Sequence, residues 1–507
     1  MCRTCYLFFL VLFVTRAYAQ NDLDAIRYSR PGIGGTSRVV AMGGAFGALG
    51  ADLSCAAYNP AGLAVFRGGD ISFSGGLKTT GNVGTLYNTT TSNPQAAFVF
   101  NNFGIVGAWP SQSDCLSRHI LAFTNTQIQN FESAVSMSGY TNSNSIAKDM
   151  LNLAQGKSLT NLNNSYEGLG YDTYLLDYDS LGKKYFSFLD TKRTVKQTRD
   201  LVTTGRVNEL NFSYAYTYKD RFYLGASLGL PQVRYESTMT HSEYDDKDSM
   251  RVVMTSDSTY NTTYVDGLPF VYASRLGFNE MTYTEYFKTT GSGVNLKLGG
   301  VVRVNDMLRI GAYYHTPTKY RLTDEYYNAL SVSFDKNKTT PKKETYPAEG
   351  GVYSYRIITP ARLGLNAGFI FQKKGLLAVD YEYVNYRKAS LQGASAADFA
   401  TANDVLQKKY SGSHNLKVGA ELNLDPFKLR AGWAVNGSPF GNTFGGSLVR
   451  NTMSVGFGYK SAGGFYLDAV LAYTFSYEDY YLFSTLDAMA KLDYRSASFG
   501  VTTGFKF

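Results

Sequence analysis

Five basic residues share one register in segments whose polar and apolar residues alternate, so their side chains are expected on the polar face of strands. A buried ammonium or guanidinium group needs an anion beside it, because an unpaired charge in a desolvated space is costly. Two outcomes stay open: the cations pair with carboxylates of the same wall, or some of them bind the acidic headgroup of a ligand. The basic residues are Lys297, Arg303, Arg309, Arg362 and Arg430, and the carboxylates in their register are Glu209, Asp380, Glu382, Glu421 and Asp468.

One turn brings two of these cations together. The turn centred on residues 305–307 places Arg303 opposite Arg309. Two like charges in that position are unfavourable unless an anion lies between them. Asp52 or a ligand headgroup is expected to supply that anion.

A second turn pairs charges of opposite sign. A two-residue turn at Asp425 and Pro426 places Glu421 opposite Arg430, both on the inner face. The apolar residues of the two strands then share the outer face. These are Leu416, Val418, Ala420, Leu422 and Leu424 on one strand and Phe427, Leu429, Ala431 and Trp433 on the other.

No arrangement of residues points to catalysis or to a metal. The four histidines show no partnering with serine and a carboxylate, so an enzyme such as a lipid hydrolase is not expected. Acidic runs at 172–179 and 245–248 are expected to be solvated loop charge, with a divalent cation as the alternative. We therefore predict no enzyme, no cofactor and no metal site. The histidines are His119, His241, His315 and His414.

Fourteen alternating segments provide the strands that must position the charged residues. The last one alternates from Phe499 to Phe507 and ends the chain on an aromatic residue, so we expect it to close a barrel against the first. The segments are 69–80, 96–109, 117–131, 205–218, 222–238, 290–304, 308–322, 354–371, 375–388, 413–424, 427–436, 451–460, 464–478 and 493–507.

Connections between the segments alternate between short and long, which is the outer-membrane pattern of short periplasmic turns and long outer loops. Outward residues beside the short turns are aromatic and would form one girdle, for which a soluble two-sheet sandwich, the alternative fold, has no use. The composition of 50 Gly, 41 Tyr and 32 Phe fits such strands. We predict an all-β fold, a 14-stranded antiparallel transmembrane barrel. The girdle residues are Tyr218, Phe222, Phe371, Phe427, Tyr459, Phe465 and Phe507.

The N-terminal part has two segments that do not alternate. Residues 1–19 carry Arg3, an apolar run and an A-x-A site, which predicts a secretory signal peptide and export through the periplasm to the outer membrane. Residues 20–68 are rich in Gly and Ala and predict a small, partly helical plug in the lumen of a barrel spanning 69–507. Within the plug, Ser37 is expected to cap a short helix over 39–49.

The mature chain keeps two cysteines. Cys55 precedes the sequence NPAGLA and Cys115 lies in the short turn between the second and third strands. A disulfide between them would tether the plug to the rim, and a free buried thiol is the alternative.

Several longer motifs resemble the FadL/TodX-type outer-membrane transporters of long-chain fatty acids and other hydrophobic compounds, in a version like that of Bacteroidetes. The resemblance covers nearly the whole mature chain. It implies a fourteen-stranded barrel, a hatch carrying the NPA motif at Asn59, Pro60 and Ala61, and ligand exit through a sideways opening in the wall. The long loops at 132–204 and 239–289 depart from the family pattern. The motifs are AMGGAFGALGAD with NPAGLA, RIGAYYHTPT at 309–318, TPARLGLNAGF at 359–369, VDYEYVNY at 379–386 and GAELNLDPFKLRAGW at 419–433.

Two further sites are hypotheses within this scheme. A register shift in the second strand predicts a bulge at Asn101, Asn102, Phe103 and Gly104, which would interrupt the wall and form the sideways exit. An amphipathic segment at 145–156 predicts a helix in the first long loop. It would form an outer capture site, or pack against its own loop. The capture residues would be Ile146, Met150, Leu153, Phe186 and Phe188, with Leu189 beside them.

The resemblance implies passive uptake of long-chain fatty acids or similar lipids, with a haemin receptor as the alternative. A general porin is less expected because the plug would fill its lumen. The expected partners are outer-membrane lipids, lipopolysaccharide, the hydrophobic ligand and the barrel-assembly machinery, which would engage the C-terminal strand. The net charge of +8 shows no basic stripe, so no nucleic acid is expected, and we predict a monomer.

Overall fold

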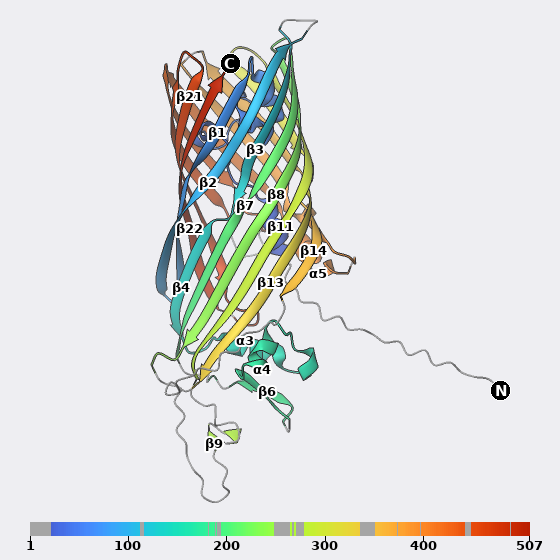
Figure 1. The fold of residues 1–507 in the computed structure, drawn as a ribbon, viewed down its shortest axis with the longest axis vertical. Coiled ribbons are helices and arrows are strands. Elements are labelled where there is room, and N and C mark those ends of the chain that lie inside the picture. The colour runs from blue at the N-terminus through green and yellow to red at the C-terminus, as the bar shows by residue number, and fades with distance from the viewer. Residues whose placement is uncertain are drawn as a thin grey trace, which may run out of the picture.

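The computed structural model is a long barrel with short turns at one end and elaborate loops at the other (Figure 1). It describes residues 22–507 except 112–115, 181, 188, 190–193, 248–263, 266–267, 270–277, 335–349, 373, 396, 442–447 and 487. The predicted signal peptide therefore lies outside the described residues.

The wall is a closed antiparallel barrel of fourteen strands, as predicted. Its first and last strands pair from Asp70 opposite Lys506 to Thr85 opposite Lys491, so the C-terminal strand closes the barrel. Four wall strands are each split into two named pieces. In chain order the wall consists of β1 (Asp70–Leu86), β2 (Thr89–Pro110), β3 (Arg118–Asn130) with β4 (Ser133–Thr141), β7 (Val195–Tyr218), β8 (Phe222–Tyr244), β11 (Phe278–Arg303), β12 (Leu308–His315) with β13 (Lys319–Phe334), β14 (Gly351–Ile358) with β15 (Arg362–Phe371), β16 (Gly375–Asn385) with β17 (Ser390–Gln392), β18 (Gly412–Leu424), β19 (Phe427–Asn436), β20 (Arg450–Lys460), β21 (Phe465–Tyr481) and β22 (Met489–Lys506). Of these pieces, β4 continues β3 along β7.

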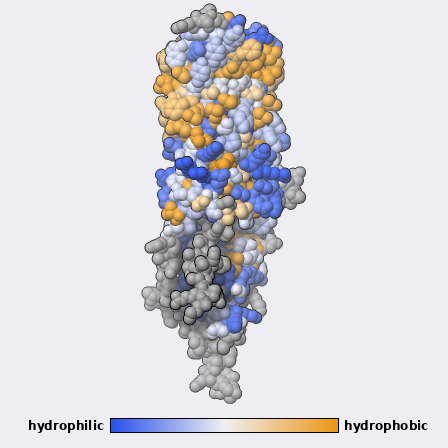
Figure 2. Space-filling view, turned by 90° about the vertical axis from the view of Figure 1, so that its right-hand side faces the viewer, coloured by the Kyte–Doolittle hydropathy of each residue, from blue (hydrophilic) through white to orange (hydrophobic). Residues whose placement is uncertain are grey.

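Alternation along each strand separates an apolar outside from a polar inside. On β19, Leu429 and Trp433 are exposed whereas Arg430 is buried. The predicted registers are confirmed, since Glu421 pairs with Arg430 and Tyr218 with Phe222. Hydrophobic residues gather on the part of the wall nearer the short turns (Figure 2). Several strands are longer than predicted and continue beyond that band at their outer ends.

Two strands predicted as continuous are broken at prolines. Pro317 separates β12 from β13, and Pro360 separates β14 from β15. Proline cannot donate a ladder hydrogen bond, so the strands are interrupted at these positions. Thr318 and Thr359 keep the wall closed there, because the Thr359 amide donates to the Thr318 carbonyl at 3.0 Å and the Thr318 amide donates to Thr359 Oγ1 at 2.9 Å.

Residues 22–66 lie inside the barrel and pack against its inner face, and we call them the hatch. Two close approaches require glycine: a Cβ on Gly43 would lie 2.8 Å from the Trp433 amide nitrogen, and one on Gly299 would overlap Asn59. The small residues therefore let the hatch backbone reach the wall. The hatch contains α1 (Asp22–Ser29), α2 (Ser37–Ala41) and the 3-10 turns η1 (Leu53–Ala56) and η2 (Pro60–Val65).

The predicted helix over 39–49 is wrong in extent and in its cap. The helix ends at Ala41, because Gly43 and Gly44 take positive φ angles of 64° and 77°. Its N-cap is Thr36, whose side chain accepts a hydrogen bond from the Val39 amide.

The first long loop folds into a cap over the outer end of the barrel (Figure 1). Buried residues of the cap share one core with the outer parts of the wall strands, including Ile146, Met150, Leu169 and Tyr283. No helix in the described ranges is long and apolar enough to cross a membrane. The remaining elements are α3 (Ile146–Ala154), η3 (Leu159–Asn161), α4 (Glu167–Asp172), β5 (Leu176–Asp179), β6 (Lys184–Ser187), β9 (Tyr264–Val265), β10 (Leu268–Pro269), η5 (Tyr386–Lys388) and α5 (Ala400–Lys409).

Candidate functional site

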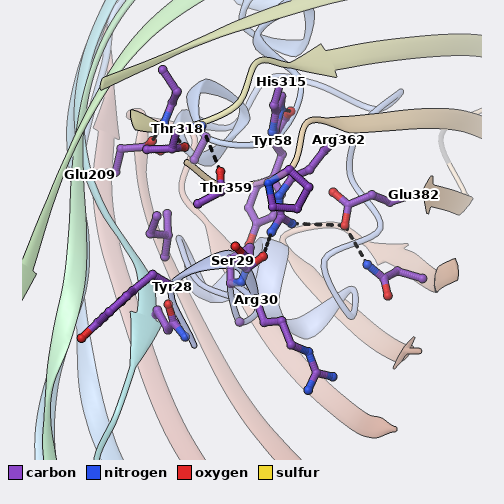
Figure 3. A pocket seen from close by; sticks show the side chains of 18 of the residues that line it. Tyr28, Ser29, Arg30, Tyr58, Glu209, His315, Thr318, Thr359, Arg362 and Glu382 are labelled. Carbon is purple, nitrogen blue, oxygen red and sulfur yellow. Dashed lines mark hydrogen bonds and ion pairs between the residues drawn. The ribbon is translucent and has the colours of Figure 1, made fainter. Parts of the chain in front are cut away.

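A cavity of about 90 Å³ lies in the lumen between the hatch and the part of the wall that contains the two proline breaks, and we call it the lumen cavity (Figure 3). Hatch residues 28–33 form one side of it, and Tyr58 closes another. The charged residues that line it are Arg30, Lys297, Arg362, Lys417 and Arg450 as cations and Glu209 and Glu382 as carboxylates.

Two of the cations are paired. Lys297 forms an ion pair with Glu209, which also accepts a hydrogen bond from Asn295 Nδ2 at 2.8 Å. Arg362 lies 3.3 Å from Glu382 and donates to the Ser29 carbonyl of the hatch (Figure 3). Lys297 and Arg362 therefore pair with carboxylates of the wall, which is one of the two outcomes expected from the sequence.

The other three cations have no carboxylate within ion-pair distance among the described residues. Within the described residues, Arg30 donates to two backbone carbonyls, Leu448 O at 2.7 Å and Gly437 O at 3.3 Å. Lys417 Nζ lies 5.2 Å from the centroid of the Tyr58 ring. With five cations against two carboxylates, the lumen cavity carries a surplus of positive charge that suits an anion.

Neutral groups of the cavity are held in place by hydrogen bonds. His315 Nε2 lies 2.6 Å from the Tyr58 carbonyl and donates to it. The Tyr58 hydroxyl donates to the Gly34 carbonyl at 2.9 Å, and burial raises the pKa of Tyr58 to about 12. Tyr58 therefore stays a neutral hydrogen-bond donor at physiological pH.

Three predicted cations lie outside the lumen cavity. Arg303 and Arg309 are opposite each other, as the turn predicted. The anion near Arg303 is however not Asp52, because Asp306 and Asp220 contact it instead. Arg309 donates to the Leu49 carbonyl at 2.7 Å.

Asp52 serves inside the hatch, where it accepts from Thr36 Oγ1 and from the Ser54 amide at 2.9 Å each. The third cation, Arg430, lies 2.6 Å from both Glu421 and Asp468. The ion network of Arg430 lies in the wall and includes no residue that lines the lumen cavity.

The NPA motif joins the hatch to the wall. Asn59 Oδ1 accepts from the Ala61 amide at 3.1 Å, and Asn59 Nδ2 donates to Gly47 O at 2.8 Å and to Asn366 Oδ1 at 3.3 Å. Pro60 begins the turn η2. Asn59 and its three hydrogen-bond partners are all buried. The motif therefore fixes the hatch to the wall and does not itself face the lumen cavity.

The predicted bulge is present in β2. The register of the β1 ladder skips Asn101, since Asn102 pairs with Ser74 and Phe100 with Gly75. Phe103 and Gly104 are fully paired with β3, which corrects the predicted extent of the interruption. Beyond Asn102, residues 89–101 of β2 have a ladder with β1 alone among the described strands, and the side chains of Thr91 and Asn93 donate to Ser136 of β4.

The hatch lies behind the place where β2 and β3 separate, which we call the wall split. The β3 ladder to β7 also shifts register at Ile128. The carbonyl of Ile128 accepts from the hatch amide of Gly32 at 2.9 Å, and Gln129 Nε2 donates to Arg27 O at 2.6 Å. Ile128 and Gln129 also line the lumen cavity, so the cavity and the wall split share residues.

The predicted helix of the capture site is confirmed as α3, but its apolar face is not on the surface. Ile146 and Met150 are at most 1% exposed and belong to the core of the cap. Leu153 lines an open groove of about 670 Å³ with mainly polar neighbours. Phe186 lies in β6, half-buried, while Phe188 falls outside the described residues. The alternative, a helix packed against its own loop, is the arrangement observed.

Cys55 is a free and buried thiol. A Cβ on Gly62 would lie 2.7 Å from its Sγ, so the thiol is packed inside the hatch and does not form the predicted tether. Cys115 lies outside the described residues. Burial raises the pKa of the Cys55 thiol, which keeps it protonated and unreactive.

Three lumen cations, Arg30, Lys417 and Arg450, are absent from the sequence predictions. Lys417 was detectable, because it alternates with the outward Leu416 and Val418. Arg450 is the first residue of its strand and Arg30 lies in the hatch, so periodicity carries no signal for either of them.

Together the wall and the hatch define a plugged antiparallel barrel with a charged cavity in its lumen. Its fold is that of the FadL/TodX-type channels for hydrophobic compounds. A Pseudomonas aeruginosa FadL homologue superposes with a TM-score of 0.52 at 15% identity, covering 94% of this chain and 98% of that one. The Pseudomonas putida toluene transporter TodX superposes with a TM-score of 0.50 at 11% identity, covering 94% and 99%. No family model and no curated protein matches the chain.

Proposed function

We propose that this protein takes up hydrophobic small molecules with an acidic headgroup, long-chain fatty acids or similar lipids, across the outer membrane. The observation that carries the proposal is the surplus of cations in the lumen cavity. A carboxylate entering a desolvated lumen needs charged donors, and neither Lys417 nor Arg450 has a carboxylate within ion-pair distance among the described residues, although Lys417 lies opposite Asp380 of β16. The fold of the channels named above supports the transport of hydrophobic compounds.

The hydrocarbon chain requires more space than the cavity has. A volume of about 90 Å³ holds about three water molecules. Next to the cavity, α1 packs its apolar face against aromatic and aliphatic side chains of the wall. A ligand chain would replace α1 on this surface, so α1 must move for binding. The surface comprises Phe131, Tyr320, Tyr355, Ile357 and Tyr386, against Ala25, Ile26 and Tyr28 of α1.

The wall split offers the ligand a route out of the lumen. It begins at Asn101 and Asn102 and is closed from the inside by hatch residues that also line the lumen cavity. Withdrawal of residues 27–34 would open the cavity toward the membrane. A hydrophobic ligand would then leave sideways into lipid without crossing water.

Binding of a fluorescent fatty acid to the purified protein tests the proposal. Arg450→Gln removes one unpaired lumen cation and is expected to weaken binding about tenfold, because charge-assisted hydrogen bonds contribute about 1.5–3 kcal/mol. Arg321→Gln is the matched control, since Arg321 is exposed on the outside of the wall. Toluene, which has no charge, should bind both variants like the wild type. Equal fatty-acid affinity for all three proteins would contradict an acidic ligand.

No observation favours haem, the alternative predicted from the sequence. His315 is the one histidine that lines the cavity, and its Nε2 is already engaged by the Tyr58 carbonyl.

A further inference from the structure

Five basic residues gather in one sector of the rim at the short-turn end, and we call them the rim patch. They come from four places in the chain: the link between the hatch and β1, the start of β3, the β7–β8 turn and the end of β11. The rim patch consists of Arg67, Arg118, Lys219, Arg221 and Arg303.

A single carboxylate holds most of the rim patch together. Asp220 lies 2.8 Å from Arg118, 2.9 Å from Arg67 and 3.7 Å from Arg303. Arg303 also pairs with Asp306. Five cations thus meet two carboxylates among the described residues, so the rim patch keeps a surplus of three positive charges.

Unused donors accompany this surplus. Arg118 Nε is buried and has no hydrogen-bond partner in the described part of the chain. Lys219 and Arg221 are exposed, and no carboxylate of the described residues lies within ion-pair distance of either. The exposed Lys219 and Arg221 are therefore available for an anion.

The two exposed cations lean over the girdle at the membrane surface. Lys219 Nζ lies 5.2 Å from the centroid of the Tyr218 ring, and Arg221 Cζ lies 5.9 Å from that of Phe222. Tyr218 and Phe222 are 44% and 43% exposed on the apolar outside of the wall. Aromatic residues at such positions lie at the level of lipid headgroups, so Lys219 and Arg221 are placed at the depth of the phosphates.

We propose that the rim patch binds the phosphate of an anionic phospholipid in the membrane leaflet at the short-turn rim. Guanidinium and ammonium groups are the donors that phosphate prefers, and cations beside a membrane attract anionic lipid. The proposal rests on the outer-membrane location in the proposed function but not on the identity of the transported ligand. Its partner is a lipid that stays with the protein, whereas the lumen cavity receives a molecule that passes through.

Native mass spectrometry of the purified full-length protein measures this binding directly. The protein is mixed with equal amounts of phosphatidylglycerol, which is anionic, and phosphatidylethanolamine, which has no net charge. The wild type is expected to retain phosphatidylglycerol preferentially. The double variant Lys219→Gln/Arg221→Gln is expected to retain about tenfold less of it, while its binding of fatty acid stays at the wild-type level.

Two comparisons make the result decisive. Lys374→Gln/Lys460→Gln removes two exposed cations from other turns of the same rim and should leave lipid retention unchanged. Asp220→Asn removes the shared carboxylate and should increase retention. Heat-dependent migration on gels confirms that each barrel is folded, and Lys219→Gln alone replaces the double variant if that one is not. Equal loss in the control variant, or no preference of the wild type for phosphatidylglycerol, would overturn the proposal.

Discussion

At the scale of single residues, two features can be tested directly: the buried ion networks of the inner face and the buried thiol of the hatch. Arg430 lies between Glu421 and Asp468 at 2.6 Å from each and is almost fully buried. Arg38 of the hatch approaches Glu421 at 3.3 Å, so this network also connects the hatch to the wall. Removing one member would leave buried charge without a partner.

We expect Arg430→Met to destabilise the folded barrel by about 3–5 kcal/mol, because Asp468 and Glu421 would lose their closest cation. Urea unfolding in lipid vesicles, followed by tryptophan fluorescence, measures the free energy. Lys428→Met is the control: Lys428 is partly exposed and lies 3.5 Å from Glu421, so its loss should cost less than about 1 kcal/mol. Similar costs for the two variants would show that the network is solvated.

The Cys55 thiol should resist alkylation by maleimide in the folded protein, because it is buried and its pKa is raised. Mass spectrometry of the peptide around Cys55, before and after denaturation in urea, gives the labelled fraction. We expect labelling only after denaturation. Rapid labelling of the folded protein, or a Cys55 that is already oxidised, would contradict a free thiol packed against Gly62.

At the scale of elements, strands were predictable and the ends of helices were not. Lipid outside and a polar lumen inside impose a period of two, which is why all fourteen strands could be located. The bulge at Asn101 was visible as a change of parity. The point at which α2 ends and the breaks at Pro317 and Pro360 depend on backbone angles and on neighbouring strands. The periodicity of the sequence carries no information about either.

The cap should open when its N-terminal anchor is removed. Glu243 accepts from Ser145 Oγ at 2.6 Å, from the Ile146 amide at 2.8 Å and from Gln197 Nε2 at 2.8 Å, so it binds the first turn of α3 to β7 and β8. Glu243→Ala should destabilise the closed cap by about 3 kcal/mol, which corresponds to about 100-fold more of the open form. Limited proteolysis of the folded barrel between residues 142 and 180 measures this opening.

Asp404→Ala serves as the control for the cap, because Asp404 forms an exposed ion pair on α5. It should not change the rate of cleavage. Cleavage of the Glu243→Ala protein at the wild-type rate would show that the hydrophobic core of the cap suffices to hold it closed.

Deleting Asn101 should slow uptake while the barrel still folds. Without this residue, Phe100 and Asn102 would follow each other in a regular ladder to Gly75 and Ser74, and every other side chain would keep its face. A straighter β2 would narrow the wall split. Uptake of labelled fatty acid into cells measures the effect, with lumen binding unchanged as the internal control. Uptake at the wild-type rate would exclude the bulge from the exit route.

At the scale of the whole molecule, three parts follow one another along the barrel: the body of the hatch, the lumen cavity with the hatch helix α1 beside it, and the cap over the outer end. The cations that give the cavity its surplus come from the hatch, from β18 and from the first residue of β20. Only folding brings them together, which is why the sequence indicated lumen charge but could not tell that Arg303 and Arg309 lie outside the cavity. Arg362 and Lys297 were predicted as cavity residues and do line it.

A structure of the protein determined with a bound long-chain fatty acid tests the account most directly. We expect the carboxylate within hydrogen-bonding distance of Arg450 or Lys417, and the hydrocarbon chain on the aromatic surface that α1 covers in the free protein, with α1 displaced. A ligand found only outside the barrel, or a lumen in which α1 stays in place and the cations face water alone, would contradict it.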